Sequence, residues 1–293
     1  MNLQTLRALL ISMRPKQWIK NVLIFTALVF DEKLLDPQAL LATIAGFFLF
    51  SLVSSTVYIL NDITDLEADR SHPKKRNRPI ASGALPISAA RWSVFLILLV
   101  AFPLAYLLSS SFFLILLSYW LLSLAYSNWL KHIVIIDVFV LASFYVIRVI
   151  AGLTLIEVTR FSPWLYVVTT LLALYIGLGK RRAELTLLSD DAFAHRKVLD
   201  GYTVPLLDQY ITIVSATTIV AYSLYTFSAP NLPENNAMML TIPFAIYGIL
   251  RYLYQVQTKQ DGGAPEEVLL TDRPLQVTLI LWGLVVFVIL YQF

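Results

Sequence analysis

Long runs of apolar residues constrain the fold of this chain more than any other feature of its sequence. Residues 94–108 and 275–290 are two such runs, and each is long enough, or nearly so, to cross the hydrocarbon core of a bilayer as a helix. Only 14% of the 293 residues are charged, and the mean hydropathy is +0.72. Because a soluble domain normally carries about a quarter charged residues, the sequence predicts an all-α polytopic membrane protein.

Nine segments have the hydropathy of membrane-spanning helices, and we expect them to form a single domain over residues 1–293. They are residues 18–31, 38–60, 88–109, 111–129, 133–155, 161–179, 206–228, 237–257 and 274–292. The first segment is short, so we expect it to tilt into the membrane from an interfacial N-terminal helix.

The distribution of Lys and Arg predicts the orientation of these segments. With the N-terminus in the cytoplasm, each of the 22 Lys and Arg residues falls on the cytoplasmic side except Lys33 and Arg160, which fall outside, and Arg148, which lies within a span. Cytoplasmic loops carry such an excess. We therefore expect a multi-pass protein of the inner (plasma) membrane with its active site in the cytoplasm. The net charge of +3 needs no nucleic-acid partner, and the absence of cysteine excludes disulfides and thiolate metal sites.

Acidic residues are concentrated at the end of the second predicted span. Asp62, Asp65 and Asp69 have the i, i+3, i+7 spacing that places side chains on one face of a helix, and Asn61 borders the same face. Like charges on one helix face repel, and the cost rises near a membrane. A divalent cation would remove this repulsion, and oxygen ligands favour Mg²⁺ or Mn²⁺. We interpret these four residues as ligands of Mg²⁺ and the three aspartates as catalytic residues.

Four cations follow the aspartates almost directly: Lys74, Lys75, Arg76 and Arg78. His72 and Pro73 precede them and predict the end of the helix. Carboxylates together with several cations suit a metal ion bound to a diphosphate, whose negative charge one Mg²⁺ does not offset. We interpret Lys74, Arg76 and Arg78 as substrate-binding residues. An alternative stays open for Lys74 and Lys75, namely that acids and bases neutralise one another and contact anionic lipid.

Two other polar clusters accompany predicted spans. In the segment RPKQWIKN, Arg14 and Lys20 either face a phosphate group or anchor the chain through the positive-inside bias, and both interpretations stay open. Asp137 lies about one turn inside the fifth predicted span, and Arg148 lies deeper. Ionisable residues at such depth usually face a cavity or bond to carbonyl groups. Eleven residues separate these two, so we expect no direct pairing and a structural role for Arg148.

A third cluster follows the sixth predicted span. Lys180, Arg181 and Arg182 come first, and they provide a second place for an anion. Lys180 and Glu184 have i, i+4 spacing, so a simple ion pair on one helix is the alternative interpretation.

The order of the motifs NDxxDxxAD, HPxKxxRPxAxG and YSxxLK resembles that of the UbiA superfamily of intramembrane prenyltransferases. The resemblance covers nearly the whole chain, and the first motif is highly specific. It implies nine transmembrane helices around a central cavity that opens sideways to lipid, and Mg²⁺-dependent diphosphate chemistry. It also implies that Tyr126 and Lys131, which belong to the YSxxLK motif, bind substrate.

One departure from the family pattern narrows this resemblance. Most members carry a second motif, DxxxD, after the sixth span, whereas here that loop begins GKRRAE and Asp190 and Asp191 are adjacent. Together with RPKQWIKN and VIRVIAG, this resembles the members that transfer 5-phosphoribose from phosphoribosyl pyrophosphate to a polyprenyl phosphate for cell-wall or glycan precursors. By this resemblance Lys180, Arg181 and Glu184 complete the donor site.

Two other functions remain as alternatives. A prenyltransferase that attaches an isoprenoid to an aromatic acceptor would consume prenyl diphosphate and leave phosphoribosyl pyrophosphate untouched. A transporter or flippase for a phosphorylated lipid would release no pyrophosphate, and it usually needs a polar site near the midplane of the membrane. The sequence leaves open the prenyl chain length and whether the chain forms a homo-oligomer.

Overall fold

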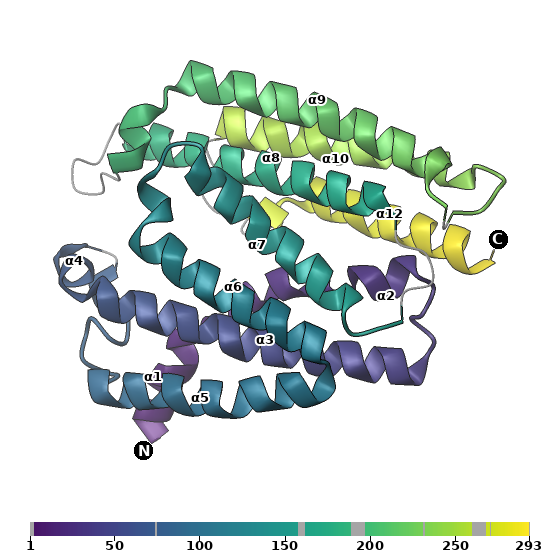
Figure 1. Ribbon diagram of the computed structural model, residues 1–293. Coiled ribbons are helices and arrows are strands. Elements are labelled where there is room, and N and C mark those ends of the chain that lie inside the picture. The colour runs from purple at the N-terminus through teal and green to yellow at the C-terminus, as the bar shows by residue number, and fades with distance from the viewer. Residues whose placement is uncertain are drawn as a thin grey trace. The chain divides into compact units, whose positions relative to one another are not determined.

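The computed structural model describes residues 3–73, 75–157, 162–188, 197–230, 232–259, 268–269 and 271–292. Each regular element in these ranges is a helix (Figure 1), which confirms the predicted all-α class. Within this part of the chain, eight helices are long and apolar enough to cross a membrane, as judged by length and composition.

These eight helices correspond to the predicted spans from the second to the ninth. They are α3 (Pro37–Thr64), α5 (Ile87–Leu108), α6 (Ser110–Asn128), α7 (Ile136–Leu153), α8 (Pro163–Leu188), α9 (Val204–Ser228), α10 (Ile242–Tyr254) with its flanking turns, and α12 (Arg273–Gln292). Several begin with a side-chain cap of the kind that satisfies free backbone amides. Asp36 accepts a hydrogen bond from the Gln38 amide at 2.9 Å before α3, and Ser109 accepts one from the Phe112 amide at 3.2 Å before α6.

The structure of the first predicted span, residues 18–31, is different from the single spanning helix that we expected. Residues Pro15–Phe25 form a 3₁₀ helix, η1, and only Thr26–Phe30 are α-helical, as α2. Lys16, Gln17, Lys20 and Asn21 interrupt the apolar run, which leaves too short a stretch for an independent spanning helix. The predicted count of nine spans is therefore not confirmed in the described residues.

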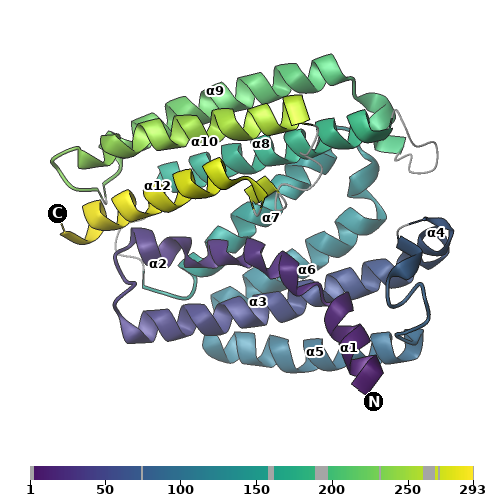
Figure 2. The same cartoon turned by 180° about the vertical axis from the view of Figure 1, so that it is seen from behind.

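The chain divides into two compact units. The first consists of Met1–Thr26, Asp36–Trp129 and Ile147–Glu157, and the second of Ala27–Leu35, Leu130–Val146 and Val158–Phe293. In the first unit, α3 lies beside α5 and α6, and α1 (Leu3–Ser12) packs near one end of α3 (Figures 1 and 2). Its buried core includes Ile59, Ile80, Leu85, Ala90 and Val94.

Short elements connect the spans of the first unit. They are α4 (Leu66–Ser71) and the 3₁₀ turn η2 (Lys75–Asn77), which both lie between α3 and α5. The predicted helix end at His72 and Pro73 is confirmed, because α4 ends at Ser71 and His72 has an extended backbone.

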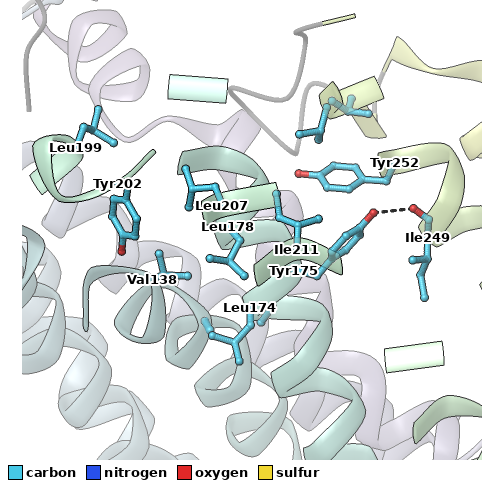
Figure 3. Packing of buried hydrophobic residues seen from close by; sticks show 14 of the residues in the cluster. Val138, Leu174, Tyr175, Leu178, Leu199, Tyr202, Leu207, Ile211, Ile249 and Tyr252 are labelled. Atoms are coloured by element: carbon cyan, nitrogen blue, oxygen red, sulfur yellow. Dashed lines mark hydrogen bonds between the residues drawn. The ribbon is translucent and has the colours of Figure 1, made fainter. Parts of the chain in front are cut away.

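In the second unit, α8 lies along α9, and α10 packs against both α9 and α12 (Figure 2). Its core joins Val138 of α7 to Leu178 of α8, Leu207 of α9 and Tyr252 of α10 (Figure 3). Tyr175 donates a hydrogen bond from its hydroxyl to the backbone carbonyl of Ile249 at 2.7 Å. The remaining short elements here are η3 (Leu130–His132), η4 (Lys197–Gly201), η5 (Ala237–Thr241) and η6 (Gln255–Lys259).

Candidate functional site

The aspartate segment is not one continuous helix. α3 ends at Thr64, Asp65 has φ −88° and ψ 11°, and α4 begins at Leu66. The expectation that Asp62, Asp65 and Asp69 share one unbroken helix is therefore wrong.

Asp62 and Asp69 nevertheless converge on a single nitrogen atom. Arg78 Nη1 donates to Asp62 Oδ1 at 3.1 Å and to Asp69 Oδ2 at 2.6 Å. Arg14 Nη2 donates to the same Oδ1 of Asp62 at 2.6 Å. We call these four residues the Asp62–Asp69 network. It contains two positive and two negative charges. The sequence predicted Arg78 and the aspartates at one site and left the role of Arg14 open, and the geometry brings all four side chains together.

Burial within the Asp62–Asp69 network is uneven. The Asp62 and Asp69 side chains are only 2% and 4% exposed, whereas those of Arg14 and Arg78 are 32% and 29% exposed. The acids are thus fixed below the surface, and the cations that cover them can be reached from outside.

Arg14 owes its place to an unusual backbone conformation. It is the residue that precedes η1, and its φ of 52° lies in the left-handed region, which non-glycine residues adopt uncommonly. Its guanidinium carbon lies 5.0 Å from the centre of the Tyr58 ring, one helical turn before Asp62, at a distance typical of a cation–π contact.

Side-chain hydrogen bonds attach η1 to α3. Ser55 donates to the Met13 carbonyl at 3.0 Å and accepts from Trp18 Nε1 at 3.1 Å. Further along, Asn21 Nδ2 donates to the Ser51 hydroxyl at 2.9 Å. These bonds hold the N-terminal segment along the helix that carries Asp62, and no spacing rule in the sequence revealed them.

Arg148 bonds to the same N-terminal segment. Its Nε donates to Asn21 Oδ1 at 2.7 Å and its Nη2 donates to the Tyr119 hydroxyl at 3.3 Å, while Phe50 and Tyr119 lie beneath its guanidinium group. These contacts fit the structural role expected for Arg148.

A second charged cluster lies in the second unit. Arg181 Nε donates to Asp137 Oδ2 at 2.5 Å, Arg181 also pairs with Glu184, and the Tyr202 hydroxyl donates to Asp137 Oδ1 at 2.7 Å. We call these four residues the Asp137 cluster. The side chains of Arg181 and Asp137 have no exposed surface. Asp137 lies in the first turn of α7, as expected, but its partner from α8 was not predicted.

The segment Lys180–Glu184 belongs to a helix and not to a loop. α8 runs to Leu188, so the predicted end of this span at residue 179 is too early. Glu184 has an i, i+3 partner in Arg181, and Arg182 Nε donates to Asp208 Oδ1 at 2.6 Å. Arg181 and Arg182 therefore both pair with carboxylates.

Tyr202 also controls the backbone before α7. Its hydroxyl accepts a hydrogen bond from the Ile135 amide at 2.6 Å, and Ile135 has φ 71°, which is rare for a β-branched residue. Burial is the main cause that raises the pKa of Tyr202 above its ordinary value, and the neighbouring carboxylate of Asp137 raises it further. A lone tyrosine has no spacing signature, so no sequence pattern indicates this role.

The other predicted site residues are more dispersed. Lys20 lies half-buried in η1, Arg76 is exposed on η2, Tyr126 is half-buried in α6, and Lys131 is half-buried on η3. In the described part of the chain, the side chains of Asn61 and Asp65 make no hydrogen bond to the Asp62–Asp69 network. Lys74, Asp190 and Asp191 lie outside the described residues.

The oxygen atoms of the Asp62–Asp69 network fit a hard divalent cation. Two buried carboxylates already surround a cationic nitrogen, and carboxylate oxygens are the ligands that Mg²⁺ prefers. Among the described residues, no three His, Cys, Asp or Glu side chains gather closely enough to form a metal site. Arg78 lies between Asp62 and Asp69, and the predicted set of four ligands stays a prediction.

Comparison with known proteins settles the family. Residues 22–270 match the model of the UbiA prenyltransferase family. The chain belongs to this family. The resemblance seen in the sequence motifs is confirmed, and UbiA membership together with eight apolar helices makes the chain a multi-pass membrane protein of a transferase family.

Individual UbiA relatives give finer detail. The chain is 35% identical over 279 residues to decaprenyl-phosphate phosphoribosyltransferase of Mycobacterium tuberculosis, which covers 92% of this chain and 90% of the relative. It is 32% identical to the protein of that name in Corynebacterium glutamicum, over 92% and 83% of the two chains. A UbiA homolog from Archaeoglobus fulgidus, solved with GPP and Mg²⁺, has a TM-score of 0.73 at 19% identity, over 97% and 99% of the chains, and shows the fold.

Proposed function

We propose that this UbiA family member transfers 5-phosphoribose from phosphoribosyl pyrophosphate to a polyprenyl phosphate and releases pyrophosphate. The observation that carries the proposal is the Asp62–Asp69 network, in which two buried carboxylates converge beneath two accessible arginines. The names of the relatives at 32–35% identity support a polyprenyl phosphate as acceptor and a phosphoribosyl group as the part transferred. The site is proposed to face the cytoplasm from a single UbiA-like domain in the inner membrane.

Mg²⁺ would be held by Asp62 and Asp69, with Asn61 and Asp65 as further oxygen ligands. When bound, it would neutralise charge on the pyrophosphate leaving group.

Arg14 and Arg78 bind the donor diphosphate in this proposal. Guanidinium groups present two parallel N–H donors that match phosphate oxygens. Both arginines are reachable from outside, as such a role requires. They stabilise the charge that develops on pyrophosphate as the ribose C1–O bond loosens toward an oxocarbenium-like state, and Lys74 and Arg76 extend this positive surface.

The acceptor needs no strong general base, because a lipid phosphate is already anionic and attacks C1 from the face opposite the leaving group. Positioning and charge stabilisation therefore supply most of the catalysis. Lys20, Tyr126 and Lys131 are proposed to bind substrate phosphates, and the prenyl chain lies against apolar helix surface.

Lys180, Arg181 and Glu184 stay predicted contacts of the donor. Because Arg181 is fully buried between two carboxylates, we propose that it acts by fixing Glu184. Replacing the second acidic motif of the family by Lys-Arg-Arg suits a reaction in which the donor diphosphate, the donor 5-phosphate and the acceptor phosphate are all anionic. An aromatic acceptor would be neutral and would need fewer cations.

A direct assay tests this proposal. The purified full chain is incubated with Mg²⁺, phosphoribosyl pyrophosphate and a polyprenyl phosphate, and the lipid is analysed by mass spectrometry. We expect a lipid heavier by one phosphoribosyl group, release of pyrophosphate, loss of both with EDTA and recovery with Mg²⁺. Consumption of a prenyl diphosphate with an aromatic acceptor, and none of phosphoribosyl pyrophosphate, would establish the alternative function instead.

A further inference from the structure

The carboxylates proposed to hold the metal are already neutralised by the protein itself. Asp62 Oδ1 accepts hydrogen bonds from two different guanidinium groups, at 2.6 Å from Arg14 and 3.1 Å from Arg78. Asp69 Oδ2 accepts from the same Nη1 of Arg78 at 2.6 Å. Arg78 therefore occupies the position between the two carboxylates that a metal ion would need.

This arrangement opposes binding of a free divalent cation. The two positive and two negative charges of the Asp62–Asp69 network cancel, so the network as a whole does not attract a cation. A dication would have to displace one or both guanidinium groups, and the displaced charges would stay nearby and repel it. Displacing them without providing new acceptors would also cost the charge-assisted hydrogen bonds.

A diphosphate removes both obstacles. Once a dication is added, the Asp62–Asp69 network has an excess of two positive charges, which a diphosphate can neutralise. Its oxygens also give Arg14 and Arg78 new acceptors to replace the carboxylates. The exposed fraction of these arginines, 32% and 29%, allows their ends to reorient while the nearly buried acids stay in place.

We propose that Arg14 and Arg78 are gating residues that exclude a free divalent cation and make metal and diphosphate bind together. Each ligand then raises the affinity for the other by the same factor, as thermodynamic linkage requires. This inference rests on the proposed function only in that the site takes a metal-bound diphosphate, and it holds for any diphosphate donor.

The test measures binding and needs no turnover. The purified full chain in detergent is titrated with Mn²⁺ alone, with inorganic pyrophosphate alone and with both, and the amount of each that is retained with the protein is measured by rapid ultrafiltration. We expect each ligand to bind at least about tenfold more tightly in the presence of the other, within the usual range of coupling between sites.

Single substitutions distinguish gating by Arg14 and Arg78 from a general effect of removing a positive charge near the site. In Arg78→Gln, we expect Mn²⁺ alone to bind about tenfold more tightly than in the wild type, and the coupling to pyrophosphate to fall toward one. Arg14→Gln, at the more exposed arginine, should act in the same direction with a smaller effect. Arg70→Gln is the matched control, because Arg70 lies on the neighbouring α4 and pairs with the exposed Glu67 at 3.1 Å. It should bind both ligands as the wild type does.

Two results would overturn the inference. The first is that the wild type binds Mn²⁺ equally well with and without pyrophosphate. The second is that Arg14→Gln and Arg78→Gln, shown to be folded by their thermal melting curves, bind Mn²⁺ alone with the wild-type affinity. Because the probe is inorganic pyrophosphate, coupled binding can be found even when phosphoribosyl pyrophosphate is not the donor. Conversely, transfer from that donor can be found together with uncoupled binding, so the two proposals fail independently.

Discussion

The Asp62–Asp69 network and the Asp137 cluster use the same residue types in opposite ways. In the Asp62–Asp69 network the acids are buried and the arginines are about one-third exposed. In the Asp137 cluster Arg181 has no exposed side-chain surface and lies between two carboxylates. A cation near solvent can exchange partners, whereas one that is buried cannot leave without uncovering unpaired charge. We therefore propose that the Asp62–Asp69 network takes part in substrate chemistry. In the Asp137 cluster, the buried Arg181 joins α7 to α8 and fixes Glu184.

The largest effect should come from Asp62→Ala. It removes a proposed metal ligand and leaves Arg14 and Arg78 without their shared acceptor, so we expect transfer to fall about a thousandfold or more. Insertion and melting temperature should change far less. Transfer is measured by the mass-spectrometric assay, with Glu67→Gln on the exposed face of α4 as the matched control that keeps near wild-type turnover. Substantial transfer by Asp62→Ala would remove this network from catalysis.

Arg181→Met should act mainly on stability. It leaves the buried Asp137 without its cation, and breaking one side of a buried ion pair costs about 3–5 kcal/mol. We expect a large loss in the free energy of unfolding, measured by denaturation in detergent. The double variant Asp137→Leu with Arg181→Met should regain much of it, because an apolar pair of similar volume leaves no charge buried. A stable but inactive Arg181→Met would instead show direct participation in catalysis.

The pH dependence of the stability of Tyr202→Phe tests whether the Tyr202 hydroxyl supports the start of α7. Loss of the hydroxyl removes a donor to Asp137 and an acceptor for Ile135, at a cost of about 1–3 kcal/mol. The raised pKa of Tyr202 means that the fold favours the neutral phenol. The stability that comes from keeping the phenol neutral is fully present below about pH 10, the ordinary pKa of a tyrosine in the unfolded chain. It is lost progressively at higher pH.

Thermal melting of the two proteins between pH 7 and 11 measures this effect. The wild type should melt at a higher temperature than Tyr202→Phe at neutral pH, and the gap should narrow above about pH 10. Lysine titration affects both proteins equally, so it cancels in the difference. A gap that stays constant or widens with pH would show that the hydroxyl contributes nothing through its protonation.

The smallest effect should come from Trp18→Phe. It removes the hydrogen bond to Ser55 that attaches η1 to α3, worth about 1 kcal/mol, and so loosens the segment that places Arg14. We expect about a fivefold rise in KM for the donor with kcat nearly unchanged. An equal fall in kcat with KM unchanged would mean that η1 acts in the transition state and not in donor binding.

The sequence specified the all-α class and eight helices because long apolar runs have few alternatives in a membrane. It also predicted that Asp62 and Asp69 lie together, although the helix expected to bring them together is interrupted at Asp65. It did not reveal that Arg78 bridges them, because this contact depends on the path of the segment between α4 and α5. Asp137 and Arg181 are 44 residues apart, so their pairing leaves no local periodicity. The first predicted span is a 3₁₀ helix followed by a short α-helix, and the sequence did not reveal that side chains of η1 bond sideways to α3.

In the proposed reaction, Asp62 and Asp69 hold a divalent metal together with the donor diphosphate. Crystals of the full chain grown with Mn²⁺ and phosphoribosyl pyrophosphate test it by anomalous scattering. We predict an Mn²⁺ peak at the carboxylates of Asp62 and Asp69, with Arg78 Nη1 withdrawn from at least one of them and bonded to phosphate. A peak elsewhere, with Arg78 still bridging Asp62 and Asp69, would show that these carboxylates do not hold the metal.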